Sequence, residues 1–179
     1  AAPSNVLHAA VLATGIPVMT SAAVLDVARD PGRSRLVLTD GRPEGPFDLV
    51  VDCSGAGTPL RRLARFPAPT MAMPFGAIWA TVPWQATGFD DGALMQRYRH
   101  ASVMIGVLPV GRHHPGGEDL AAFFWSLPVD THAALLGDGF ARWRDRVLGL
   151  WPETAPLLGA IGDFETLTLA RYQHGTMRV

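Results

Sequence analysis

The fold is decided by residues 47–62, FDLVVDCSGAGTPLRR. The mostly apolar run 49–53 is typical of a short strand that is buried on both faces. A glycine-rich turn follows it, and then a helix start in which Thr58 is the expected N-cap and Pro59 the first helical residue. The order of strand, glycine turn and helix N-terminus gathers exposed backbone N–H groups at one point, which favours an anion such as a nucleotide phosphate.

The composition indicates a soluble globular protein. The chain has 179 residues, is 48% hydrophobic and carries a net charge of −1. It contains no apolar run of the roughly 18 residues that a membrane span needs. Its 15 basic residues, all of them arginine, are scattered along the chain, and this scatter together with the net charge of −1 argues against nucleic-acid binding. The single cysteine, Cys53, excludes an internal disulfide and fits a reducing, cytoplasmic compartment, and we expect it to pack within its strand.

The region before the deciding stretch predicts one helix and a hairpin. Residues 4–14 place apolar side chains at helical spacing, and 16–20 is a short β-rich segment. Two alternating runs, 22–29 and 35–39, flank the turn sequence Asp-Pro-Gly-Arg at 30–33, which predicts a β-hairpin. A polar loop then leads to the deciding strand.

After residues 47–62 the composition changes at three prolines, Pro67, Pro69 and Pro74, where a new region begins. Successive strands separated by glycine-rich loops predict an antiparallel sheet, with strands at 75–82, 96–100, 103–110 and 121–127. Aromatic and aliphatic residues at helical spacing predict an amphipathic helix at 140–151, a short helix at 155–161 and a last strand at 164–172. The fold class is therefore mixed α/β, with domains at 1–66 and 67–170 and a return segment at 171–179.

Candidate chemistry is sparse in this sequence. The turn Gly55-Ala-Gly57 lacks the third small residue of a dinucleotide fingerprint, because Leu60 stands there, so it can also be a plain tight turn. His113 and His114 precede a Pro-Gly-Gly loop without a third metal ligand nearby, which favours a solvated loop. Among the five tryptophans, the two on sheet strands, Trp79 and Trp125, are the candidates for pocket walls.

The stretch 48–61 resembles the second conserved motif of flavin-dependent aromatic hydroxylases and their relatives, which include halogenases and prenyl reductases. In that family an apolar strand leads into Ala-Asp-Gly, two variable residues, Ser, two more and Arg. Here Gly55 and Arg61 match, Ser54 replaces the Asp and Thr58 replaces the Ser. The order of predicted elements is similar to the middle of that fold over nearly the whole chain, with Ser4 where the family's first helix has an arginine.

The resemblance implies part of a Rossmann-like FAD-binding domain, followed by an antiparallel-sheet substrate domain with flanking helices. The cofactors would be FAD and NAD(P)H, and the reaction would be the hydroxylation of an organic substrate, such as an aromatic one, with oxygen. It places Ser54, Gly55 and Arg61 near the cofactor. One face of the sheet would roof the substrate, with the candidates Trp79, Gln96, Tyr98, Met104 and Trp125.

The resemblance also implies that the first glycine-rich motif would precede residue 1 and a Gly-Asp motif would follow residue 179. We therefore expect the chain to be an internal part of a larger enzyme, inactive alone, whose partners are the rest of the same protein and a small organic substrate. Two other functions remain open: a flavin-dependent reductase or halogenase, and a non-catalytic α+β module that binds a small apolar ligand or a partner chain. The absence of lysine argues against a halogenase.

Overall fold

The computed structural model describes residues 3–55, 57–63, 70–84 and 88–175 and has the expected mixed α/β fold. The chain divides into two compact units. One comprises Ala1–Gly15 with Ala72–Tyr172, and the other Ile16–Met71 with Gln173–Val179. The domain boundary predicted at 66–67 lies outside the described residues. Among the helices that the structure describes, none combines the length and the apolar character required to cross a membrane.

The first unit is built on a five-stranded sheet with the order β5-β6-β7-β4-β8. The pairs β5–β6, β6–β7 and β7–β4 are antiparallel, as the sequence predicted. The strands are β4 (Thr70–Pro83), β5 (Met95–Arg99), β6 (Val103–Gly111), β7 (Leu120–Pro128) and β8 (Thr168–Gly175). Strand β8 begins later than predicted because the Asp163 carboxylate accepts hydrogen bonds from the Glu165 and Thr166 N–H groups, which closes a 3₁₀ turn, η4 (Phe164–Thr166).

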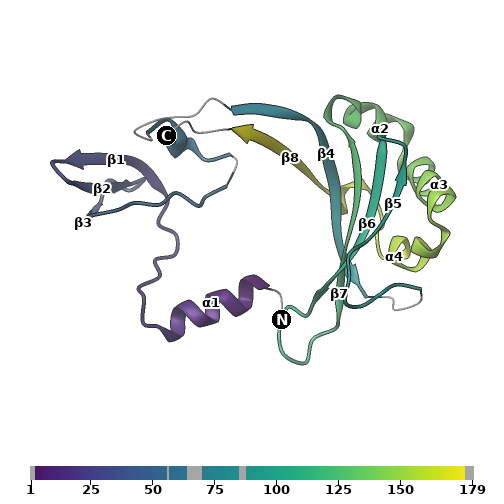
Figure 1. Ribbon diagram of the computed structural model, residues 1–179, viewed down its shortest axis with the longest axis horizontal. Helices are drawn as coiled ribbons and strands as arrows, with labels where there is room; N and C mark the ends of the chain where they lie inside the picture. Colours follow the sequence, from purple (N-terminus) through teal and green to yellow (C-terminus); the bar gives the residue numbers. More distant parts are fainter. Residues whose placement is uncertain (1–2, 56, 64–69, 85–87, 176–179) are drawn as a thin grey trace. The chain divides into compact units, whose positions relative to one another are not determined.

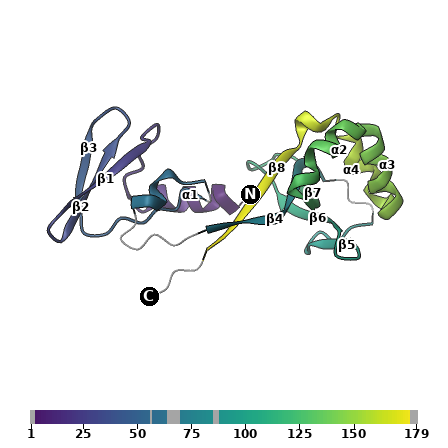
Figure 2. The ribbon, with the colours of Figure 1, turned by 90° about the horizontal axis from the view of Figure 1, so that it is seen from above.

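Helices cover one face of this sheet (Figures 1 and 2). They are α2 (His132–Asp138), α3 (Phe140–Leu150) and α4 (Ala155–Gly159), with short 3₁₀ turns η2 (Val129–Thr131) and η3 (Pro152–Thr154). The amphipathic pattern at 140–151 predicted α3, whose Trp143 and Val147 are fully buried against the sheet. Helix α2 escaped prediction because it has only seven residues, of which Leu135 alone is buried.

The predicted helix at 4–14 is α1 (Pro3–Ala13), grouped with the sheet unit. The Asn5 side chain donates a hydrogen bond to the backbone carbonyl of His113. Apolar side chains of α1 are nevertheless exposed, Leu7 by 67% and Leu12 by 55%. This helix therefore carries an apolar surface that the described residues leave uncovered.

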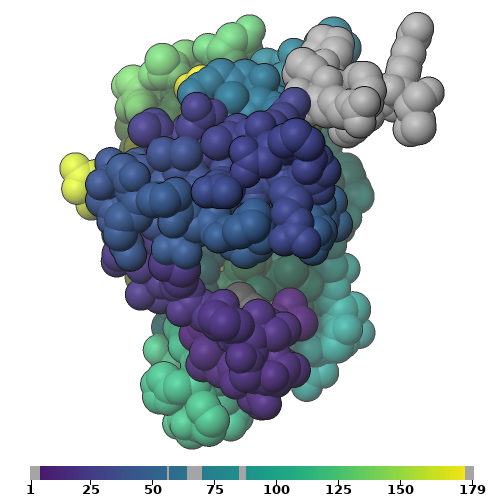
Figure 3. All heavy atoms as spheres, turned by 90° about the vertical axis from the view of Figure 1, so that its left-hand side faces the viewer, coloured from purple at the N-terminus to yellow at the C-terminus, as the bar shows by residue number. Residues whose placement is uncertain are grey.

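The second unit contains a three-stranded antiparallel sheet (Figure 3, blue). Strands β1 (Val24–Asp30) and β2 (Arg33–Leu38) form the predicted hairpin, and Gly32 takes the positive φ of +75° that the turn requires. The loop predicted next contains β3 (Pro43–Phe47), an edge strand on β2, the position in a sheet that tolerates proline. The β-rich segment 16–20 forms no strand.

The strand predicted at 49–53 is wrong. This stretch belongs to neither sheet, and Leu49 is 77% and Val51 70% exposed. An apolar run becomes a strand only where a neighbour supplies backbone partners, and no described strand pairs with it. The packing expected for Cys53 fails for the same reason, since Cys53 is exposed. Among the described residues of this unit, Leu38 is the only buried apolar residue.

Candidate functional site

The carboxylate of Asp52 organises the glycine turn that follows the apolar run at 49–53, called the extended run below. Its Oδ1 accepts hydrogen bonds from the Ser54 N–H at 2.9 Å and the Ser54 hydroxyl at 2.5 Å. Its Oδ2 accepts one from the Thr58 hydroxyl at 2.6 Å. Asp52 thus joins both ends of the glycine turn, and it is a functional candidate that the sequence reasoning missed.

The predicted helix start is present, although the helix is a short 3₁₀ segment, η1 (Pro59–Leu63). The Thr58 hydroxyl oxygen accepts a hydrogen bond from the Leu60 N–H at 3.2 Å, which confirms Thr58 as the cap. Gly55 has a φ of +95°, and a Cβ added to either Gly55 or Gly57 would meet no atom within 4 Å. The turn is therefore open on its glycine side.

Arg61 lies half-buried on η1 and holds the second unit together. Its guanidinium donates hydrogen bonds to the Gln173 side-chain oxygen at 2.8 Å and to the Thr70 hydroxyl at 3.3 Å. Gln173 is 112 residues away in sequence, so Arg61 joins the two chain segments that make up the second unit. Ser54 and Gly55 are exposed and lie in the turn just before this helix. The three residues predicted to contact the cofactor therefore belong to one turn and the helix that follows it.

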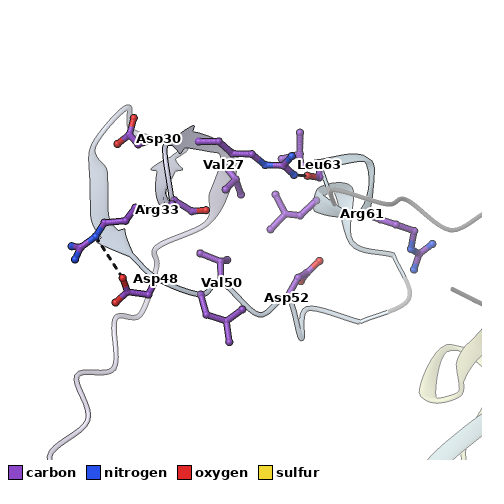
Figure 4. A pocket seen from close by; sticks show the side chains of 13 residues that line it. Val27, Asp30, Arg33, Asp48, Val50, Asp52, Arg61 and Leu63 are labelled. Carbon is purple, nitrogen blue, oxygen red and sulfur yellow. Dashed lines mark hydrogen bonds and ion pairs between the residues drawn. The ribbon is translucent and has the colours of Figure 1, made fainter. Parts of the chain in front are cut away.

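A hollow of about 810 Å³ lies between the hairpin, the extended run and η1 (Figure 4). The side chains of Val27, Val50 and Leu63 line it, together with Asp52. At its rim, Arg33 forms an ion pair with Asp48 at 3.5 Å. Arg61 is also among the residues that line the hollow, and Figure 4 shows its guanidinium end directed away from it. Its floor is apolar and its rim charged, a combination suited to an apolar chain segment or to a ligand with a polar edge.

The hydrogen bonds of Asp52 make the turn acid-sensitive in a defined direction. The hydroxyls of Ser54 and then Thr58 lower the pKa of the Asp52 carboxyl below its ordinary value of 3.8, with Arg61 adding a smaller attraction. A lowered folded-state pKa means that the carboxylate supports the turn at all pH values above the ordinary range and releases it only as the pH falls through the lowered value. We expect the Ser54 amide resonance to be constant from neutral pH down to about pH 5 and to shift only in stronger acid. Asp52→Asn should abolish that shift, and a wild-type shift centred above the ordinary value would contradict the assignment.

The second candidate surface is the face of the five-stranded sheet opposite the helices. Trp79 and Phe124 lie opposite each other on β4 and β7, with ring centroids 4.7 Å apart. The Phe124 ring lies over Gly106 on β6, where an added Cβ would come within 2.0 Å of it. The Trp79 indole N–H is buried and has no acceptor among the described residues. Two aromatic rings and an unused donor therefore lie together on this face.

Polar but uncharged side chains continue the same face. The Tyr98 hydroxyl donates to the Gln96 side-chain oxygen at 2.7 Å, and the Gln96 amide contacts the Met104 sulfur at 3.1 Å. The Ser126 hydroxyl accepts from the Met104 N–H at 2.7 Å. Because side chains alternate along a strand, Trp79, Gln96, Tyr98 and Met104 share this face.

The Trp125 side chain does not lie on this face of the sheet. It is 5% exposed and packs edge-on against Trp143 of α3, with centroids 6.3 Å apart. The expectation that one face carries all five candidates is therefore wrong for Trp125. Its neighbours in sequence, Phe124 and Ser126, occupy the open face instead and were missed. The strand register is the feature that identifies these two residues, because Trp79 pairs with Phe124 and cross-strand partners point to the same face of a sheet.

No metal site emerges from the residues that the structure describes. His113 and His114 are exposed in the loop between β6 and β7, as expected. That loop is held by Arg112, whose guanidinium makes two 2.8 Å hydrogen bonds to the Asp119 carboxylate.

No protein-family model and no curated protein matches this sequence. Solved structures do share its fold. The tetrameric form of 2-methyl-3-hydroxypyridine-5-carboxylic acid oxygenase matches with a TM-score of 0.68 at 19% identity, covering 93% of this chain and 44% of that one. The flavin-dependent halogenase CmlS matches with a TM-score of 0.62 at 18% identity, covering 93% and 30%. PqsL of Pseudomonas aeruginosa, a probable FAD-dependent monooxygenase, matches with a TM-score of 0.58 at 19% identity, covering 82% and 39%.

These likenesses establish the fold that the sequence motif predicted. The chain spans 39% of PqsL and 44% of the oxygenase, less than half of each. Its five-stranded sheet with helices on one face and its separate three-stranded sheet are therefore elements of an architecture found in larger flavin-dependent proteins.

Proposed function

We propose that this chain is part of an FAD-dependent monooxygenase that uses NAD(P)H and oxygen to hydroxylate an organic, aromatic substrate. The observation that carries the proposal is the open face of the five-stranded sheet, where the Trp79–Phe124 ring pair lies beside uncharged polar groups. The fold shared with flavin-dependent monooxygenases supports a flavin as the partner of this face.

The residues present fit a flavin as a secondary contact. A Cβ added at Gly55 or Gly57 would meet no atom within 4 Å, so a ligand can approach the backbone there. Ser54, Gly55 and Arg61 would lie along the cofactor, with Arg61 also anchoring the motif through Gln173. When bound, reduced flavin supplies the oxygen chemistry.

The sheet face would orient the substrate and exclude water. Trp79 is partly exposed and packs on the buried Phe124 ring, so it offers flat apolar surface for stacking on an aromatic ring. The linked pair of Tyr98 and Gln96 can hydrogen-bond a polar group of the substrate. Because these side chains are all uncharged, the face favours a neutral ring system over a carboxylate.

A lysine near the substrate is expected of a halogenase, and all 15 basic residues of this chain are arginine, which supports hydroxylation as far as this part of the protein is concerned. The uncovered apolar side chains, Leu7 and Leu12 on α1 and Leu49 and Val51 beside the hollow, support a working form in which further polypeptide packs against them. The activity is therefore proposed for that larger assembly, present in cytoplasm.

The test is a matched pair of leucine substitutions in the FAD-loaded protein expressed from the complete reading frame. Trp79→Leu should raise KM for an aromatic substrate up to about tenfold, because a lost stacking contact amounts to about 0.5–1.5 kcal/mol. Flavin reduction by NAD(P)H should be unchanged. Trp125→Leu removes the same ring from the opposite face and should lower the unfolding midpoint with little change in KM. Absence of substrate-stimulated NAD(P)H oxidation in the wild-type protein would refute the proposal.

A further inference from the structure

A cavity of about 430 Å³ lies on the helix-covered side of the five-stranded sheet, opposite the proposed substrate face. Strands β5 and β6 form one wall through Arg99 and Val103, which are partners in the strand register. Helix α3 forms the other wall through Arg146, Gly149 and Leu150, which a spacing of three and four residues places on one side of the helix. The lining residues all belong to one compact unit, so that unit forms the cavity by itself.

The floor of this cavity is apolar. The buried Trp125 side chain lines it together with Val103 and Leu150. An adjoining space of about 190 Å³ is also lined by Val103, Trp125 and Arg146, so the apolar floor continues beyond the first cavity. On the α3 side, a Cβ added at Gly149 would meet no atom within 4 Å. A flat apolar body can therefore enter beside Gly149 and lie against Trp125.

Two guanidinium groups border this apolar floor. The Arg99 side chain has no hydrogen-bond or ion-pair partner among the described residues, while its backbone carbonyl is held by the Ser102 N–H and hydroxyl at 3.3 and 2.9 Å. Arg146 donates one hydrogen bond of 2.5 Å to the Asp138 carboxylate, which Arg142 also approaches at 3.6 Å. Since Asp138 is shared between two guanidiniums and Arg146 has further N–H donors, the border of the cavity favours an anionic ligand.

We propose that this cavity is a second ligand site, which binds a small carboxylate with a flat apolar body. The apolar body lies against Trp125, and the carboxylate accepts hydrogen bonds from Arg99 and Arg146. The side chains of the open face, by contrast, are uncharged and favour a neutral ring. The two faces of the sheet therefore select different ligands. This inference goes beyond the proposed hydroxylation, and Trp125 contacts a ligand in it from the face opposite the one predicted.

The test titrates cinnamate and its uncharged amide, cinnamamide, into the chain and follows backbone amide resonances of α3. Cinnamate should shift the Gly149 and Leu150 amides saturably, and these amides report this cavity because α3 lies on the helix-covered side of the sheet. Cinnamamide should bind there about tenfold more weakly, since it loses the charge-assisted hydrogen bonds to the two guanidiniums. Equal affinities of the two compounds at these amides, or no shift with cinnamate, would overturn the inference.

Three variants assign the binding to this cavity. Arg99→Gln should weaken cinnamate about three- to tenfold and leave cinnamamide unchanged, because Arg99 is exposed and its loss leaves no described partner unpaired. Gly149→Leu fills the cavity and should abolish the binding of both compounds. Arg144→Gln is the matched control, since Arg144 lies on α3 outside the lining residues, and it should behave as wild type.

An affinity for cinnamate that either Arg99→Gln or Gly149→Leu leaves unchanged would contradict the assignment to this cavity. Arg99→Gln keeps the test decisive if Gly149→Leu lowers the unfolding midpoint, because it replaces only an exposed side chain. The titration involves no flavin, so failure here would leave the monooxygenase proposal standing, and absence of NAD(P)H oxidation would leave this inference untouched.

Discussion

Replacing Trp143 with alanine is expected to destabilise the sheet-and-helix unit by about 3–5 kcal/mol. Trp143 is fully buried on α3, and its ring packs against four aromatic side chains at centroid distances of 5.3 to 6.3 Å, namely Phe123, Trp125, Phe140 and Phe164. Removing it leaves a cavity between α3 and the sheet that these rings cannot close. A loss of this size is a large share of the 5–15 kcal/mol typical of a domain. Urea unfolding followed by circular dichroism measures it.

Two further substitutions serve as comparisons for Trp143→Ala. Trp143→Phe keeps most of the ring and removes an indole N–H that has no acceptor in the described part of the chain, so it should cost clearly less than alanine. Leu136→Ala, on α2 and 43% exposed, should change stability by no more than about 0.5 kcal/mol. If Trp143→Ala shifted the unfolding midpoint no more than Leu136→Ala, the core would be located elsewhere.

Replacing Gly106 with alanine is expected to disrupt the open face of the sheet. The new Cβ would lie 2.0 Å from Cε1 and 2.1 Å from Cζ of Phe124, so the ring must leave its place over β6. Phe124 is only 5% exposed and is packed on Trp79, and its displacement should cost about 1–3 kcal/mol. The change should appear in near-ultraviolet circular dichroism, which reports the Trp79–Phe124 pair.

Gly149→Ala provides the matched control. Gly149 lies on α3 and an added Cβ there would meet no atom within 4 Å. Alanine is the better helix former by up to about 1 kcal/mol, so this variant should be slightly more stable than wild type. An unchanged near-ultraviolet spectrum in Gly106→Ala would show that the position of the Phe124 ring does not require a glycine at residue 106.

Local patterns were enough to predict most elements. The spacing of Trp143, Val147 and Trp151 predicted α3, and the Pro31-Gly32 turn predicted the hairpin of β1 and β2. These elements form from neighbours close in sequence, so the sequence itself contains their signal. The motif at 48–61 pointed to the flavoprotein fold that the structural comparisons share.

Features that depend on distant partners were not predictable in this way. The run at 49–53 has the composition of a buried strand, yet a strand requires a pairing neighbour, which no local pattern reveals. Trp125 stands in LAAFFWSLP, a run so uniformly apolar that alternation gives no face, and its register with β4 was needed to orient it. Asp52 was read as part of an apolar strand, since its role arises from hydroxyls two and six residues later.

The exposed run at 49–51 also bears on how this polypeptide behaves in concentrated solution. Leu49, Val50 and Val51 are apolar, and none of the strands that the structure describes pairs with them, so they form the type of segment that associates edge to edge between molecules. Asp48 and Asp52 flank it on either side. Charges in such positions oppose intermolecular stacking through mutual repulsion. The carboxylate that shapes the turn thus also serves, with Asp48, as a gatekeeper against aggregation.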